Sequence, residues 1–220
     1  RPLEDASHLI DVGTGAGALL AGIQRAASRA TVRGVDSSEG MLRLARAKHP
    51  GPFSIMDVQN LMLPNDQFDV AVVAFVLFHL PHPDRCLAEV NRVLKPGGTV
   101  GTVTWATQGP TKADLIWEDE LEAAGARVVE LPATDNRSSC DTPEKMIALL
   151  ERAGFLSSQA WIESLEHRWR PEDHCDDQIR SPSRLRIRAR TSGHPDPCHD
   201  RWSGRARAAG ARPLPDRAGR

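Results

Sequence analysis

Residues 8–20 read HLIDVGTGAGALL, an apolar run that changes into alternating glycines and then into a second apolar stretch. The apolar segment His8–Val12 is typical of a buried strand, and residues 16–30 carry leucine and isoleucine at helical spacing. The three glycines therefore lie where a strand turns into a helix. Small residues at such a junction let a ligand approach the backbone closely, so we expect a binding site there.

The rest of the chain alternates between predicted strands and helices. Strands are expected at 31–36, 52–57, 68–80 and 99–105, helices follow Ser38, cover 84–94 and run from Thr142 to Gly154, and KPGG at 95–98 predicts a turn. The stretch at 68–80 is apolar almost throughout, as in a central strand that is covered on both faces. This alternation predicts an α/β fold with a doubly wound, mostly parallel sheet.

Two classes of ligand fit the glycine segment. Its pattern Gly13-x-Gly15-x-x-Ala18, with Asp36 about 20 residues on, satisfies the fingerprint of dinucleotide-binding proteins, in which the carboxylate holds ribose hydroxyls. S-adenosylmethionine also contains a ribose, so the same carboxylate fits that ligand. A nicotinamide-dependent oxidoreductase and an S-adenosylmethionine-dependent enzyme both remain open at this point.

Four motifs in register favour the second class. They are DVGTGAG at 11–17, GVDSS at 34–38, the segment 56–80 that begins MDVQ and ends LFHL, and RVLKPGG at 92–98. In this order and spacing the chain resembles the class I S-adenosylmethionine-dependent methyltransferases. It is most similar to the subgroup of ubiquinone/menaquinone-biosynthesis C-methyltransferases and small-molecule methyltransferases, over roughly Leu9–Leu165.

The resemblance implies a site for S-adenosylmethionine. The residues that it places there are Asp11, Gly13, Gly15, Gly17, Asp36, Ser37, Met41, Asp57, Val58, Ala74 and Phe75. The glycine segment would lie against the methionine part of the ligand, and Asp36 would accept both ribose hydroxyls. Asp57 and Val58 would bind the adenine edge while Met41 packs on its face. Ala74 and Phe75 would line the path near the sulfonium.

Two histidines follow the predicted fourth strand, close to the expected methyl donor. His79 is the better-placed candidate for a general base and His82 the weaker one, although either could be a structural histidine. If His79 is the base, the variant His79→Ala loses turnover but keeps its affinity for the cofactor.

The acceptor is expected to be a small, apolar or aromatic molecule. Methyltransferases that act on nucleobase amino groups resemble one another in an Asn/Asp-Pro-Pro-aromatic loop after the fourth strand, whereas this chain reads AFVLFHLP and contains no tyrosine. A nucleic-acid acceptor is therefore not expected. Phe75, Phe78, Trp105 and Trp117 could face the acceptor or belong to the core.

The sequence predicts a domain over 1–170 followed by a different kind of segment over 171–220. In the family a sixth strand, here Gly154–Ser164, is followed by a seventh, and no stretch after about Pro171 alternates as that strand should. From Arg180 onward, eleven arginines face three aspartates. The tail could bind nucleic acid, be disordered, or arise from a reading-frame slip, and the abrupt change in composition favours the slip.

Composition limits the remaining possibilities. The four cysteines are scattered, and no stretch approaches the length of a membrane span, which predicts a cytoplasmic protein with reduced thiols and no membrane association. His174-Cys175 and Cys198-His199 do not have the spacing of a short zinc motif, so no metal site is expected. A catalytically silent core that only binds cofactor stays open as an alternative.

Overall fold

A computed structural model describes residues 3–107, 109, 112–123, 125 and 136–164. The chain divides into two compact units, residues 1–107 with 134–163 and residues 108–133 with 164–220. The predicted boundary near residue 170 and the arginine-rich tail lie outside the described residues. None of the described helices is both long and apolar enough to span a bilayer.

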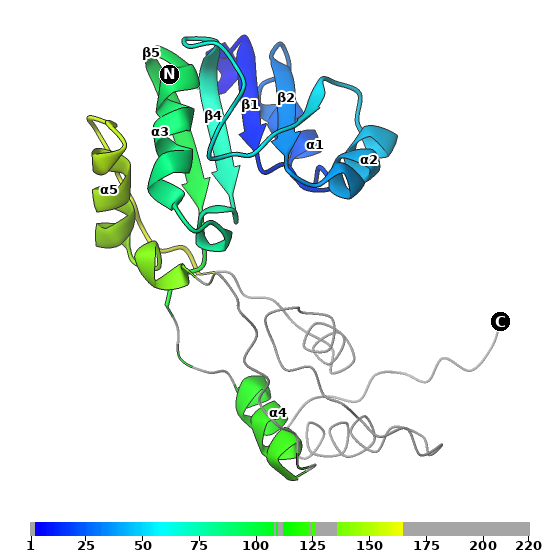
Figure 1. Ribbon diagram of the computed structural model, residues 1–220, viewed down its shortest axis with the longest axis vertical. Helices are drawn as coiled ribbons and strands as arrows, with labels where there is room; N and C mark the ends of the chain where they lie inside the picture. The colour runs from blue at the N-terminus through cyan, green and yellow to red at the C-terminus, as the bar shows by residue number, and fades with distance from the viewer. Residues whose placement is uncertain (1–2, 108, 110–111, 124, 126–135, 165–220) are drawn as a thin grey trace, which may run out of the picture. The chain divides into compact units, whose positions relative to one another are not determined.

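The first unit is built on a sheet of five parallel strands (Figure 1). The strands are β1 (His8–Val12), β2 (Thr31–Asp36), β3 (Phe53–Ile55), β4 (Phe68–Ala74) and β5 (Leu94–Val103). Their order in the sheet is β3-β2-β1-β4-β5, and every neighbouring pair is parallel. The sequence prediction of a doubly wound, parallel α/β sheet is confirmed.

Three helices connect strands of this unit, and a fourth, α5, follows the last strand. They are α1 (Leu20–Ala26), α2 (Glu39–Lys48), α3 (Pro83–Val93) and α5 (Pro143–Arg152), with short 3-10 turns η1 (Leu3–Asp5), η2 (Leu77–His79) and η3 (Arg137–Ser139). Ser38 and Thr142 cap α2 and α5, each accepting a hydrogen bond from a backbone N–H three residues on. The second unit contributes α4 (Lys112–Ala123).

The two faces of the sheet pack against different helices. Ile10, Val12 and Val73 join the apolar sides of α3 and α5 in the larger core cluster. Leu9 and Val70, which point to the other face, pack against α1 in a smaller cluster. The alternation of side chains along each strand therefore covers the central strands on both faces, as their apolar sequences predict.

Three predicted elements differ in extent. Helix α1 begins only at Leu20, because the glycines before it adopt positive φ angles that interrupt a helix. Strand β4 ends at Ala74, since Phe75 has a φ of 57° and leaves the extended conformation. The predicted turn at 95–98 lies within β5 as a bulge, where the register against β4 shifts.

The predicted sixth strand at Gly154–Ser164 is wrong. The segment has no strand structure, and Leu156 and Trp161 are 99% and 73% exposed. A strand forms only against a partner that satisfies its backbone groups. Among the described residues the sheet ends at β5, and this segment has no strand beside it.

A buried carboxylate connects three strands at the amino-terminal edge of the sheet. Asp69, at the start of β4, accepts hydrogen bonds from the backbone N–H groups of Ser7 and His8 and from Lys95 Nζ, at 3.0, 2.9 and 3.0 Å. Burial raises the pKa of Asp69, but these hydrogen bonds and the charge of Lys95 outweigh it and hold the pKa at about 2.

Asp69 should make the stability of the fold depend on pH in the acid range. Because its pKa is lowered from 3.8 to about 2, its contribution is complete above pH 4 and is lost as the pH falls through 2. We expect Asp69→Asn to lower the free energy of unfolding by about 2 kcal/mol at pH 6 and by much less at pH 2.5. Urea unfolding at both pH values measures this, and an equal loss at both would contradict the assignment.

Candidate functional site

The glycine segment forms a turn that wraps around the end of β2. Gly13, Gly15 and Gly17 have φ angles of 75°, 54° and 80°. The N–H groups of Gly13 and Thr14 both donate to the carbonyl oxygen of Val35, at 2.8 and 2.9 Å. The turn is therefore fixed to the neighbouring strand by its own backbone.

Gly13 leaves no room for a side chain. A Cβ at this position would lie 2.3 Å from Cγ2 of Val76, which follows β4. By contrast, a Cβ at Gly15 would meet no atom within 4 Å. The turn is therefore packed against Val76 at Gly13, whereas the space next to Gly15 is open and would admit a ligand.

Asp36 links the turn to the end of β2. Its Oδ2 accepts the N–H of Gly15 and its Oδ1 accepts the N–H of Ser38, both at 2.8 Å. The N-cap of α2 is Ser38, so Asp36 does not have that role. Each carboxylate oxygen has a second lone pair, which leaves two acceptor positions on a half-buried side chain.

Asp11 supports the turn from beneath. It is only 2% exposed, and its Oδ2 accepts the hydroxyl of Thr14 at 2.6 Å. Burial raises the pKa of Asp11, the Thr14 hydrogen bond lowers it, and the nearby charge of Asp36 raises it further. Asp11 is therefore a buried residue of β1 that supports the turn.

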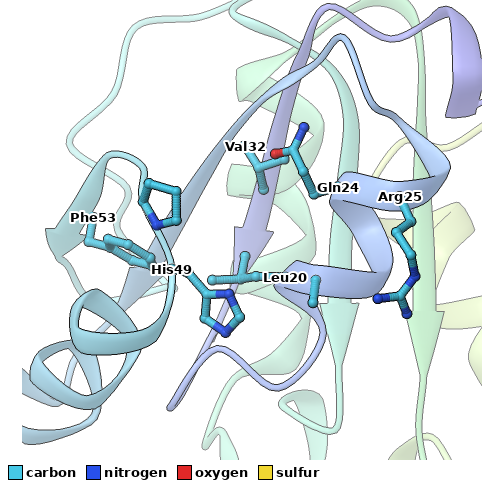
Figure 2. A pocket seen from close by; sticks show the side chains of 8 residues that line it. Leu20, Gln24, Arg25, Val32, His49 and Phe53 are labelled. Atoms are coloured by element: carbon cyan, nitrogen blue, oxygen red, sulfur yellow. The ribbon is translucent and has the colours of Figure 1, made fainter.

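A shallow pocket lies beside the glycine turn. Leu20, Ala21, Gln24, Arg25, Val32, His49, Pro50 and Phe53 line this pocket of about 260 Å³. Figure 2 shows His49 next to Leu20, and both side chains would contact a Cβ placed on Gly17, at 2.9 and 3.0 Å. None of the residues predicted to bind the cofactor lines this pocket.

The loop after β3 brings Asp57 to the same edge of the sheet. Met56 donates its N–H to the carbonyl oxygen of Asp36 at 3.0 Å, and Oδ1 of the exposed Asp57 accepts the N–H of Gln59 at 2.9 Å. The side chain of Val58 is buried. Ser37 and Met41 are exposed at the start of α2, and Met41 also donates its N–H to Ser38.

A partly buried ion pair between Arg92 and Glu89 holds the part of this loop that follows Val58. Arg92 donates to the carbonyl oxygens of Leu61 and Leu63, each at 2.7 Å, and pairs with Glu89 at 2.7 Å. Glu89 in turn accepts the N–H of Leu61 at 2.7 Å. The Arg92 hydrogen bond lowers the pKa of Glu89, so the pair stays charged.

Two aromatic side chains follow β4 and β5. The N–H of Phe75 donates to the carbonyl oxygen of Val103 at 2.7 Å, and the rings of Phe75 and Trp105 have centroids 4.8 Å apart at 40°. Ala74 is the half-buried last residue of β4. Phe78 is buried, and Trp117 is buried in α4 of the other unit.

The two candidate bases lie on the surface, His79 as the last residue of η2 and His82 three residues later. His79 is exposed, with its ring centroid 4.2 Å from that of Phe78. Asn136 holds this turn, since its backbone N–H donates to Phe78 O at 3.1 Å and its amide donates to Leu80 O. His82 is also exposed, and its N–H donates to Gln59 Oε1 at 3.2 Å.

The geometry thus gathers most of the predicted residues at one edge. The glycine turn, Asp36, Asp57 and Phe75 lie at the carboxyl ends of β1, β2, β3 and β4, where open α/β sheets bind their ligands. Hydrogen bonds or packing contacts join the segments that follow neighbouring strands of the sheet.

Comparison with known proteins identifies the fold. Residues 10–101 match the family model described as a methyltransferase domain. Over these residues the chain carries a methyltransferase domain. Solved structures of S-adenosylmethionine-dependent methyltransferases share its fold. One from Methanosarcina mazei covers 75% of this chain and 86% of its own (TM-score 0.55, 21% identity), and one from Thermotoga maritima covers 70% and 65% (TM-score 0.51, 22% identity).

Two named methyltransferases are similar to this chain in sequence. A protein of Aspergillus luteorubrus named "Probable methyltransferase" is 32% identical over 170 residues, which are 70% of this chain and 58% of that protein. The demethylmenaquinone methyltransferase of Chlamydia trachomatis is 38% identical over 102 residues, 45% of this chain and 44% of its own. The chain spans about half the length of these relatives.

Several supports of the methyltransferase site were not predicted from the sequence. Thr14 pairs with Asp11, and Gly34 lets the ring of Phe53 approach β2, since a Cβ there would lie 2.7 Å from that ring. Arg92 holds the loop after Asp57. Thr14 is the fourth residue of DVGTGAG and its pairing with Asp11 is local, whereas the Arg92 contacts depend on the path of the loop.

Proposed function

We propose that this methyltransferase domain binds S-adenosylmethionine and transfers its methyl group to a small-molecule acceptor. The observation that carries the proposal is Asp36, whose two carboxylate oxygens each hold one backbone N–H of the site and keep one further lone pair. A pair of vicinal ribose hydroxyls matches two such acceptors.

The residues that would hold the ligand are those predicted from the sequence: Asp11, Gly13, Gly15, Gly17, Asp36, Ser37, Met41, Asp57, Val58, Ala74 and Phe75. Their roles differ. The open space above Gly15 suits the methionine part of the ligand, and Asp57 Oδ2, to which no described residue donates, would accept the adenine amino group. Asp11 would act by supporting the turn rather than through direct contact.

The protein's part in the reaction is to position the acceptor. S-adenosylmethionine supplies a methyl group on a sulfonium, which is already a good leaving group. The chain therefore has to align the acceptor atom, exclude water and remove a proton where the acceptor carries one. Phe75 lies at the path to the acceptor, and exposed His79 is the proposed general base.

A cytoplasmic location is part of the proposal. The buried Cys86 and Cys140 are both free thiols, as in a reducing compartment.

The variant His79→Ala should lose most of its turnover. We expect kcat to fall about 100-fold, the usual size of a general-base contribution, while the dissociation constant for S-adenosylhomocysteine stays within a factor of three. His82→Ala is the matched control, because it removes a second exposed imidazole nearby. If His79→Ala keeps full turnover, His79 is not the base.

Transfer of radioactive label from [methyl-³H]S-adenosylmethionine to a panel of phenols, thiols and amines tests the reaction itself. Labelled product in one chemical class would support methyl transfer. Binding of S-adenosylhomocysteine without any labelled product would favour the silent core that only binds cofactor, and binding of NADH alone would favour an oxidoreductase.

A further inference from the structure

We infer that Phe75 and Trp105 form one wall of the acceptor site and select a planar aromatic acceptor. The inference rests on the proposed function, because it assigns the acceptor side of the same site. The two residues follow the carboxyl ends of adjacent strands, β4 and β5, so they lie at the edge of the sheet where the glycine turn lies.

The backbone at Phe75 is held in an unfavourable conformation. Its φ of 57° is unusual for a residue with a bulky side chain. Two contacts enforce it: the N–H of Phe75 donates to Val103 O at 2.7 Å, and the next residue, Val76, packs against Gly13. Strained backbone of this kind persists where the surroundings determine it, and it is concentrated at functional sites.

Phe75 and Trp105 are two large aromatic side chains that are partly exposed to solvent. Phe75 is 37% exposed and Trp105 is 56% exposed, although burying them would be strongly favourable. Val103, the last residue of β5 and the acceptor of the Phe75 N–H, is also half exposed. Their rings touch each other at 4.8 Å and 40°, so the pair presents a continuous aromatic surface.

A planar aromatic molecule suits this surface better than a saturated one of equal size. Aromatic rings gain from offset or edge-to-face contact with each other, beyond the gain from burial of apolar area alone. A saturated ring of the same size gains only from the burial. The geometry therefore predicts that an aromatic acceptor binds about tenfold more tightly than a saturated molecule of the same size.

Two matched probes test the preference: 2-naphthol and decahydro-2-naphthol, which share a bicyclic skeleton and a hydroxyl but differ in their π system. Each is titrated by calorimetry into the full chain saturated with S-adenosylhomocysteine. We expect 2-naphthol to bind about tenfold more tightly. In Trp105→Leu this ratio should fall to about threefold, because Phe75 still offers one ring, and in Trp105→Phe it should remain close to that of the unmodified chain.

Trp161→Ala is the control, since it removes another exposed tryptophan that lies outside the strands. Its ratio should be unchanged. Equal binding of the two probes by the unmodified chain, or a preference as large in Trp105→Leu as in the unmodified chain, would overturn the inference. The chain is first titrated with S-adenosylhomocysteine alone. If it does not bind this ligand, the proposed function fails, and this outcome is distinct from failure of the aromatic preference.

Discussion

An Asp36→Ala variant should bind S-adenosylhomocysteine at least 100-fold more weakly than the unmodified chain. The substitution removes two charge-assisted acceptors for the ribose, each contributing about 1.5–3 kcal/mol. It also frees the N–H groups of Gly15 and Ser38, which the carboxylate now holds at 2.8 Å. Isothermal titration at constant salt concentration measures the change.

Glu39→Gln is the matched control for Asp36→Ala. It removes one negative charge from an exposed residue in the first turn of α2, close in sequence but outside the turn and its hydrogen bonds. Its affinity should stay within twofold. Comparable losses in the two variants would show that net charge decides binding, and the ribose assignment of Asp36 would be wrong.

A Gly13→Ala variant should lose both stability and ligand binding. The new Cβ would overlap Cγ2 of Val76 at 2.3 Å, and the φ of 75° is itself unfavourable for alanine. Together the overlap and the strain should lower the free energy of unfolding by about 2–4 kcal/mol. Urea unfolding and a titration with S-adenosylhomocysteine measure the two effects.

The control for this glycine lies in the next helix. Gly22 is within α1, where the nearest atom to an added Cβ is Arg25 Nη2 at 3.9 Å. Gly22→Ala should therefore stabilise the chain by about 0.5–1 kcal/mol. A Gly13→Ala variant as stable as Gly22→Ala would mean that Val76 does not pack against the turn.

The central part of the fold could be predicted because local patterns and the fold agree there. The apolar run at 8–12, the glycines and the caps at Ser38 and Thr142 each point to the same parallel sheet. Asp36 could be placed by its distance from the glycines alone. The structure adds that both of its carboxylate oxygens already hold backbone N–H groups.

Other features depend on contacts between distant residues. The apolar run at 68–80 looks like one long strand, but the Val103 and Gly13 contacts end it at Ala74 and expose Phe75. The segment 154–164 has the composition of a strand and no described partner. Whether a segment with strand composition pairs depends on its neighbours, which a local pattern does not contain.

Thermal unfolding of the chain with S-adenosylmethionine, S-adenosylhomocysteine and NADH added separately shows which ligand the folded chain binds. A ligand that binds only the folded state stabilises it by about 2.7 kcal/mol at 100 times its dissociation constant, so the unfolding midpoint rises by several degrees. We expect the unfolding midpoint to rise with S-adenosylmethionine and with S-adenosylhomocysteine and to stay unchanged with NADH. A rise with NADH alone would show that S-adenosylmethionine is not the ligand of this site.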